Sequence, residues 1–133
     1  MKIKREIIEK IILHAKKDAP VEACGYLAQK DDIVIRHYEL TNVDKSNEHF
    51  SFDPHEQFQA VKDARAGGLE VCAAYHSHPH SPARPSNEDI KLAYDPQLRY
   101  VIISLANGKE EVRSFKINDT HVEQETIEVI DDD

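Results

Sequence analysis

The stretch from Leu69 to Tyr75 constrains the fold of this chain more than any other part of it. Every residue of the stretch except Glu70 is apolar, so no alternation between a buried and an exposed face is visible. A strand of this kind is covered on both sides, which predicts the central strand of a sheet with helices on either face. His76 follows directly, so this strand would end on a chemically active side chain.

Shorter patterns on either side of this stretch complete a mixed α/β domain. The predicted helices are residues 4–18, the segment from Asp53-Pro54 to Gly67-Gly68, and the segment from Ser86 to Tyr94. The other predicted strands are residues 23–28, 33–38, 49–52, 99–105, 111–117 and 119–130. Asn107-Gly108 predicts a hairpin between two of these strands. Because no repeat or low-complexity linker interrupts the pattern, we expect one domain, residues 1–133, with a mixed sheet flanked by helices.

Length, charge and cysteine content exclude several classes of protein. A chain of 133 residues is long enough for one core and too short for two. Its 17 Lys and Arg residues against 25 Asp and Glu residues give a net charge of −8, which disfavours binding to nucleic-acid phosphates. No apolar run approaches the roughly 20 residues that cross a bilayer. We therefore expect a cytoplasmic protein that binds neither nucleic acid nor membrane, with Cys24 and Cys72 as reduced thiols.

Two histidines at the end of the central strand form the strongest candidate site. Because residues i and i+2 of a strand point to the same side, His76 and His78 can present two imidazoles to one metal ion. A hydrolytic zinc ion needs a third protein ligand and an open position for water. Asp89 is the natural third ligand, since it lies in the first turn of the helix that follows the loop. Ser86, at the start of the same helix, could point its hydroxyl at the metal-bound species.

Each part of this pattern also has an ordinary structural explanation. Taken alone, Ser86-x-x-Asp89 is typical of a helix N-cap, in which the serine accepts an amide hydrogen bond and the aspartate complements the helix dipole. A single His-x-His pair is most often a solvated polar pair. The occurrence of both at the two ends of one proline-stiffened loop favours a metal site. His80 follows Pro79 within that loop and is predicted not to be a ligand.

The order of these residues resembles the signature of a known family. The run His76-Ser77-His78-Pro79, then six residues and Ser86, then two residues and Asp89, is similar to the signature of the JAMM (MPN-plus) zinc metalloproteases. That family also requires an upstream glutamate, and Glu22, just after the first helix, resembles it in its setting. A likeness to the small stand-alone bacterial members extends over roughly residues 5–117 and includes Asn42-Val43, Phe50 and Asp53-Pro54.

The resemblance implies a fold and a role for each residue of the site. The fold would be cytidine-deaminase-like, an α/β domain whose mixed sheet is flanked by helices on both faces. Zinc would be held by His76, His78 and Asp89. Glu22 would act as general base and acid, and Ser86 would support the oxyanion. General chemistry agrees with these roles, because zinc lowers the pKa of bound water to about 7 and a positioned carboxylate can relay its proton.

Members of this family cut amide or isopeptide bonds after the C-terminal Gly-Gly of ubiquitin or ubiquitin-like proteins. The loop after His78 and the connection after Asp89 are short, which leaves little room for the insertion that some eukaryotic members use to recognise ubiquitin chains. The closer resemblance is to bacterial enzymes that process ubiquitin-like sulfur-carrier proteins, so a zinc peptidase acting on such a carrier is the expected function. A non-catalytic MPN-type scaffold is the alternative from another class, and a metal-dependent phosphoesterase is a second one.

Overall fold

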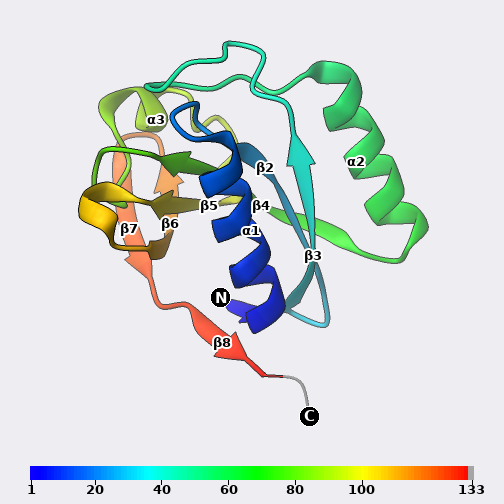
Figure 1. Cartoon of the computed structure of the whole chain (residues 1–133). Helices are drawn as coiled ribbons and strands as arrows, with labels where there is room; N and C mark the ends of the chain where they lie inside the picture. Colours follow the sequence, from blue (N-terminus) through cyan, green and yellow to red (C-terminus); the bar gives the residue numbers. More distant parts are fainter. Residues whose placement is uncertain (132–133) are drawn as a thin grey trace.

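The computed structural model describes residues 1–131, so the last two residues of the predicted domain lie outside the described range. Its α-helices are α1 (Arg5–Asp18), α2 (Pro54–Ala66) and α3 (Asn87–Lys91) (Figure 1). Its strands are β1 (Lys2–Lys4), β2 (Cys24–Lys30), β3 (Ile33–Leu40), β4 (Glu70–His78), β5 (Arg99–Ser104), β6 (Glu111–Asn118), β7 (His121–Glu125) and β8 (Glu128–Ile130). Among these residues no helix is both long and apolar enough to pass through a lipid bilayer.

The strands form one mixed sheet in the order β7-β6-β5-β4-β2-β3-β1-β8. The apolar stretch of the sequence is β4, which lies inside the sheet, antiparallel to β2 and parallel to β5. Every residue from Cys72 to His78 is buried, so the expected central strand with two covered faces is confirmed.

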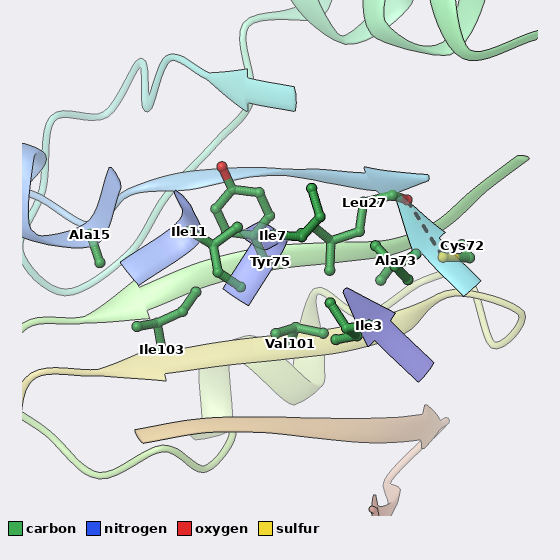
Figure 2. Packing of buried hydrophobic residues seen from close by; sticks show 11 residues of the cluster. Ile3, Ile7, Ile11, Ala15, Leu27, Cys72, Ala73, Tyr75, Val101 and Ile103 are labelled. Atoms are coloured by element: carbon green, nitrogen blue, oxygen red, sulfur yellow. Dashed lines mark hydrogen bonds between the residues drawn. The ribbon is translucent and has the colours of Figure 1, made fainter. Parts of the chain in front are cut away.

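Helices cover both faces of this sheet. Ile7 and Ile11 of α1 pack in one cluster with Tyr75 of β4 (Figure 2). Ala60 of α2 packs in another cluster with Ala74, the chain neighbour of Tyr75. Because successive side chains of a strand point to opposite faces, α1 and α2 lie on opposite sides of β4. The expected α/β architecture, a mixed sheet with helices on both faces, is therefore confirmed.

The short helix α3 lies on the same face as α2. Its Ile90 packs against buried Ile102 of β5, whereas the neighbours Val101 and Ile103 belong to the cluster under α1. The loop that joins β4 to α3 consequently stays on one face. It brings the start of α3 back to the end of β4, where the candidate ligands lie.

The sheet curls until its two edges meet. β7 and β8 stand at opposite ends of the strand order, yet only Thr126 and Ile127 separate them along the chain. The Met1 amino group donates a hydrogen bond to the Thr126 carbonyl oxygen (2.9 Å), and the Glu128 amide donates to the Met1 carbonyl oxygen (2.8 Å). Ile127 packs against the same cluster as α1, so the turn between β7 and β8 lies on the face of the sheet that α1 covers.

Two predictions near the chain ends were wrong. Residue 4 was expected to open a helix, but Lys2–Lys4 forms β1 between β3 and β8, because the fully buried Ile3 completes the core from within the sheet. The single edge strand expected at 119–130 is two strands, since the chain pairs first with β6 and then crosses to β1.

Two other elements are shorter than expected. No strand forms over residues 49–52, where only Phe52 pairs, through an isolated bridge to Asn42. The Ser51 amide donates its hydrogen bond to the Asn42 side chain, so it does not pair with a neighbouring strand. Helix α3 ends at Lys91 rather than at Tyr94, and the Tyr94 side chain is 81% exposed, so no packing extends the helix that far. The β5–β6 hairpin forms, although a 3-10 turn over Ala106–Gly108 makes its loop longer than a two-residue turn.

Candidate metal centre

The end of β4 presents two imidazoles to the face that carries α3. His76 and His78 are both buried, and their Nε2 atoms lie 3.1 Å apart. Ser77 points to the opposite side, where its Oγ accepts a hydrogen bond from the Ala23 amide (2.8 Å). The alternation of side chains along a strand therefore places the histidine pair as the sequence predicted.

Asp89 closes the cluster from the start of α3. Its Oδ2 lies 3.1 Å from His76 Nε2 and 3.0 Å from His78 Nε2. The Ser86 amide also donates to this oxygen (2.9 Å), while the Asp89 amide donates to Ser86 Oγ (3.0 Å). Burial opposes ionisation of Asp89, but the hydrogen bonds from the two histidines outweigh burial and hold the pKa of this carboxyl well below its usual range. Asp89 is therefore a carboxylate aimed at both imidazoles.

The two histidines are oriented by different neighbours. His78 Nδ1 lies 2.8 Å from the Pro82 carbonyl oxygen, which can only accept, so Nδ1 carries a proton. Nε2 is therefore the nitrogen that would bind a cation, after it loses the proton that it shares with Asp89. His76 is stacked against Phe50, with ring centroids 4.6 Å apart and an interplanar angle of 25°. A second neighbour that fixes the ring of a metal-binding histidine is a regular feature of metal sites.

The three side chains fit a zinc ion by donor type and by spacing. His76, His78 and Asp89 are the group of described residues whose candidate ligand atoms converge, all within 4.8 Å of one another. Ligand atoms about 2.0–2.1 Å from a tetrahedral zinc ion stand about 3.3 Å apart, close to the 3.0–3.1 Å separations observed. Two imidazole lone pairs at this separation repel each other unless a proton or a cation lies between them. Three protein ligands would also leave one tetrahedral position for water.

Glu22 lies beside this cluster and is almost fully buried, with 3% of its surface exposed. Among the described residues its Oε1 has no hydrogen-bond partner. Burial raises the pKa of Glu22 to about 7, although the positive charge of His78 partly opposes the shift. A carboxyl with a pKa near neutrality can both accept and return a proton at physiological pH. Glu22 is close enough to His78 and Asp89 for the charges of both to act on its pKa, and its role as base, which the resemblance implies, stays a prediction.

Ser86 is the N-cap of α3 and forms a capping box with Asp89. The ordinary capping explanation of this pair therefore applies, and it coexists with the convergence of Asp89 on the histidines. Because Ser86 Oγ accepts from the Asp89 amide, its hydroxyl hydrogen stays available as a donor. Ser86 itself is exposed, so this donor is accessible to a bound molecule.

A small, mostly apolar pocket of about 40 Å³ opens beside His76 and Asp89. It is lined in addition by Phe50, Leu92 and Tyr100. This volume holds only a few water molecules, at about 10–15 Å³ each. The cluster therefore borders a space that is large enough for water.

Other candidate groups stand apart from the cluster. His80 is exposed and does not join the converging group, in agreement with the sequence analysis. Burial raises the pKa of the Cys24 thiol to about 12, which disfavours the thiolate that a nucleophile needs, and Cys24 packs in a buried apolar cluster. Sequence reasoning missed how Phe50 stacks on His76. An aromatic residue in a loop gives no sign of which ring it will cover.

Comparison with known proteins gives the family. The family of prokaryotic homologs of the JAB domain (Prok-JAB) matches residues 4–118. The CysO-cysteine peptidase of Mycobacterium tuberculosis is 33% identical over 132 residues, which cover 97% of this chain and 90% of that protein. A probable TtuB-protein conjugate cleaving protease of Thermus thermophilus is 34% identical over 114 residues, 85% of this chain and 73% of that protein.

Among solved structures, the solution structure of a protein from Desulfitobacterium hafniense is 43% identical, with a TM-score of 0.90. That alignment covers 98% of this chain and 93% of the other. The resemblance noted in the sequence is confirmed over nearly the whole described chain. This chain therefore belongs to the family of prokaryotic homologs of the JAB domain and is a small JAMM-like protein.

Proposed function

We propose that this protein is a zinc metallopeptidase that hydrolyses the amide bond after the C-terminal Gly-Gly of a ubiquitin-like sulfur-carrier protein. The observation that carries the proposal is the convergence of His76 Nε2, His78 Nε2 and Asp89 Oδ2 within 3.0–3.1 Å of one another. The match to peptidases and conjugate-cleaving proteases supports the reaction class. The proposal assigns the whole chain, residues 1–133, to one metallopeptidase domain, and places it in the cytoplasm, where its two free cysteines would stay reduced.

The residues of the site would divide the chemistry among them. His76, His78 and Asp89 would hold the metal ion. Zinc, when bound, would supply a Lewis acid and a water of lowered pKa. Glu22, ionised at a pH above about 7, would take a proton from water and return it to the leaving amine. The exposed hydroxyl of Ser86 would donate to the oxygen of the scissile carbonyl as negative charge develops there, which contributes about 2.7–4 kcal/mol in comparable sites.

The substrate assignment rests on the named relatives and on the narrowness of the site. One relative is named for a CysO-cysteine bond and another for TtuB-protein conjugates. The pocket beside the cluster, at about 40 Å³, has no room for a large side chain, and glycine residues would bring the substrate backbone close to the ligands. An extended Gly-Gly tail would satisfy both constraints.

Two other functions make different predictions for the metal. A non-catalytic MPN-type scaffold would not need the ligand cluster, and it would not need a buried glutamate without a partner for its Oε1 atom. A phosphoesterase commonly uses two metal ions about 3.5–4 Å apart. Within residues 1–131 one group of three candidate ligands converges, which favours a single ion.

The test combines metal analysis with a cleavage assay. The purified protein should hold one zinc ion per chain after dialysis, and it should release a reporter fused to the Gly-Gly end of a sulfur-carrier protein. Glu22→Gln, with zinc bound, should lose this activity. A zinc-loaded wild type that cleaves no such fusion would refute the proposed substrate, and equal rates for wild type and Glu22→Gln would refute the assigned base.

A further inference from the structure

Asn42 is a buried polar residue whose side chain makes four hydrogen bonds, and only 5% of its surface is exposed. Its Nδ2 donates to the carbonyl oxygens of Glu22 and His49, both at 3.0 Å. Its Oδ1 accepts from the amides of Asp44 (3.1 Å) and Ser51 (3.2 Å). Both amide hydrogens and both lone pairs are used, which fixes the orientation of the side chain.

These bonds tie Glu22 to the connection between β3 and α2, residues 41–53. The Glu22 amide also donates to the Ser46 carbonyl oxygen in this connection (2.8 Å). Both backbone polar groups of Glu22 are thus held by residues 41–53. The next residue, Ala23, is held by β4 instead, through hydrogen bonds with Ser77 in both directions. Glu22 therefore stands between two anchors: β4 holds the next residue, and the connection holds the backbone of Glu22 itself.

The same connection places Phe50 on His76. Phe50 lies between His49 and Ser51, whose backbone groups both bond to the Asn42 side chain. Its ring stacks on the imidazole of His76 at a centroid distance of 4.6 Å. One buried amide thus fixes two things at once: the backbone that carries Glu22 and the ring that orients one candidate metal ligand.

We propose that Asn42 is a positioning residue that holds Glu22 in register with the metal centre, by tying the backbone of Glu22 to the segment that stacks Phe50 on His76. Its catalytic consequence rests on the proposed function, whereas its structural consequence does not. Misplacing a catalytic group by about 1 Å can reduce a rate about 100-fold. The loss of Asn42 should therefore reach the chemistry without removing any group that touches substrate.

Asn42→Asp tests this role with little change in shape. The carboxylate keeps the acceptor for the Asp44 and Ser51 amides, but it cannot donate to the carbonyl oxygens of Glu22 and His49. On zinc-loaded protein and the carrier fusion, we expect kcat to fall about 10- to 100-fold with KM little changed. Asn47→Asp is the matched control, because it makes the same change at an exposed position of the same connection.

A second readout does not depend on activity. In NMR spectra, the ring protons of His76 should carry an upfield shift from the stacked Phe50 ring, and this shift should shrink in Asn42→Asp and persist in Asn47→Asp. If Asn42→Asp fails to fold, Asn42→Ser replaces it in the same two measurements. Serine is too short to make the hydrogen bonds of Asn42 to Glu22 and His49, and it buries no charge.

The outcomes separate the two proposals. If Asn42→Asp matches Asn47→Asp in kcat and in the His76 ring shift, the positioning role is wrong. If the wild type cleaves no carrier fusion, the proposed function fails, and the ring shift still decides whether Asn42 positions the site.

Discussion

Replacing Glu22 with glutamine should stabilise the metal-free protein while it removes the proposed base. Burial raises the pKa of Glu22 from 4.5 to about 7, so the folded chain binds this proton more tightly than the unfolded chain does. Between these two pH values the unfolded state loses the proton first, so the free energy of unfolding falls as pH rises. At about 1.4 kcal/mol per pH unit, the 2.5-unit difference corresponds to about 3 kcal/mol lost above pH 7.

Glutamine has the shape of the protonated carboxyl and no charge, so Glu22→Gln should avoid this loss. Urea denaturation of chelator-treated wild type and variant, from pH 4 to pH 8, measures it. The two proteins should be about equally stable near pH 4, and the variant should gain about 3 kcal/mol by pH 8. Glu9→Gln, at an exposed position of α1, is the control and should show no such dependence. A Glu22→Gln variant that is no more stable than wild type at pH 8 would refute the conclusion that burial raises the pKa of Glu22.

Three further substitutions test the site and its support. Ser86→Ala should lower kcat about 10²- to 10³-fold in steady-state kinetics, because the hydroxyl that would donate to the scissile carbonyl is lost. It should also lower the free energy of unfolding by about 1 kcal/mol in urea titration, because the N-cap of α3 is lost. A kcat for Ser86→Ala equal to that of the wild type would exclude the donor role of Ser86. Asp89→Asn keeps the side-chain shape but removes the charge, so metal analysis after dialysis should find little zinc, and full retention would contradict Asp89 as a ligand. Gly25→Ala would place a Cβ in steric clash with the Tyr38 carbonyl oxygen of the neighbouring strand β3, so we expect urea titration to show a loss of about 3 kcal/mol. An unchanged urea midpoint would show that β2 and β3 can move apart at this position without cost.

The sequence predicted the core of the fold because its strongest signals are local. The apolar run before His76 identified β4, and the side-chain alternation of a strand placed His76 and His78 on one side. The capping pattern of Ser86 and Asp89 located the start of α3, which the loop returns to the end of β4. These inferences needed no knowledge of contacts between distant parts of the chain.

The parts that were wrong or unseen depend on contacts between distant residues. The strand Lys2–Lys4 was not foreseen, and residues 119–130 were assigned to one strand instead of two, because the structure of both segments is set by pairing between the two ends of the chain. The setting of Glu22 came only from the family resemblance, since an isolated glutamate beside a proline has no pattern of its own. The hydrogen bonds of Asn42 join residues 20 positions apart along the chain, and no spacing rule predicts them.

Zinc K-edge X-ray absorption on the purified, dialysed protein reports the metal centre itself. We predict one zinc ion per chain with nitrogen and oxygen neighbours at about 2.0–2.2 Å, including two imidazole rings, as His76, His78 and Asp89 would give. A sulfur neighbour at about 2.3 Å, or protein that retains no stoichiometric zinc, would contradict the metallopeptidase assignment.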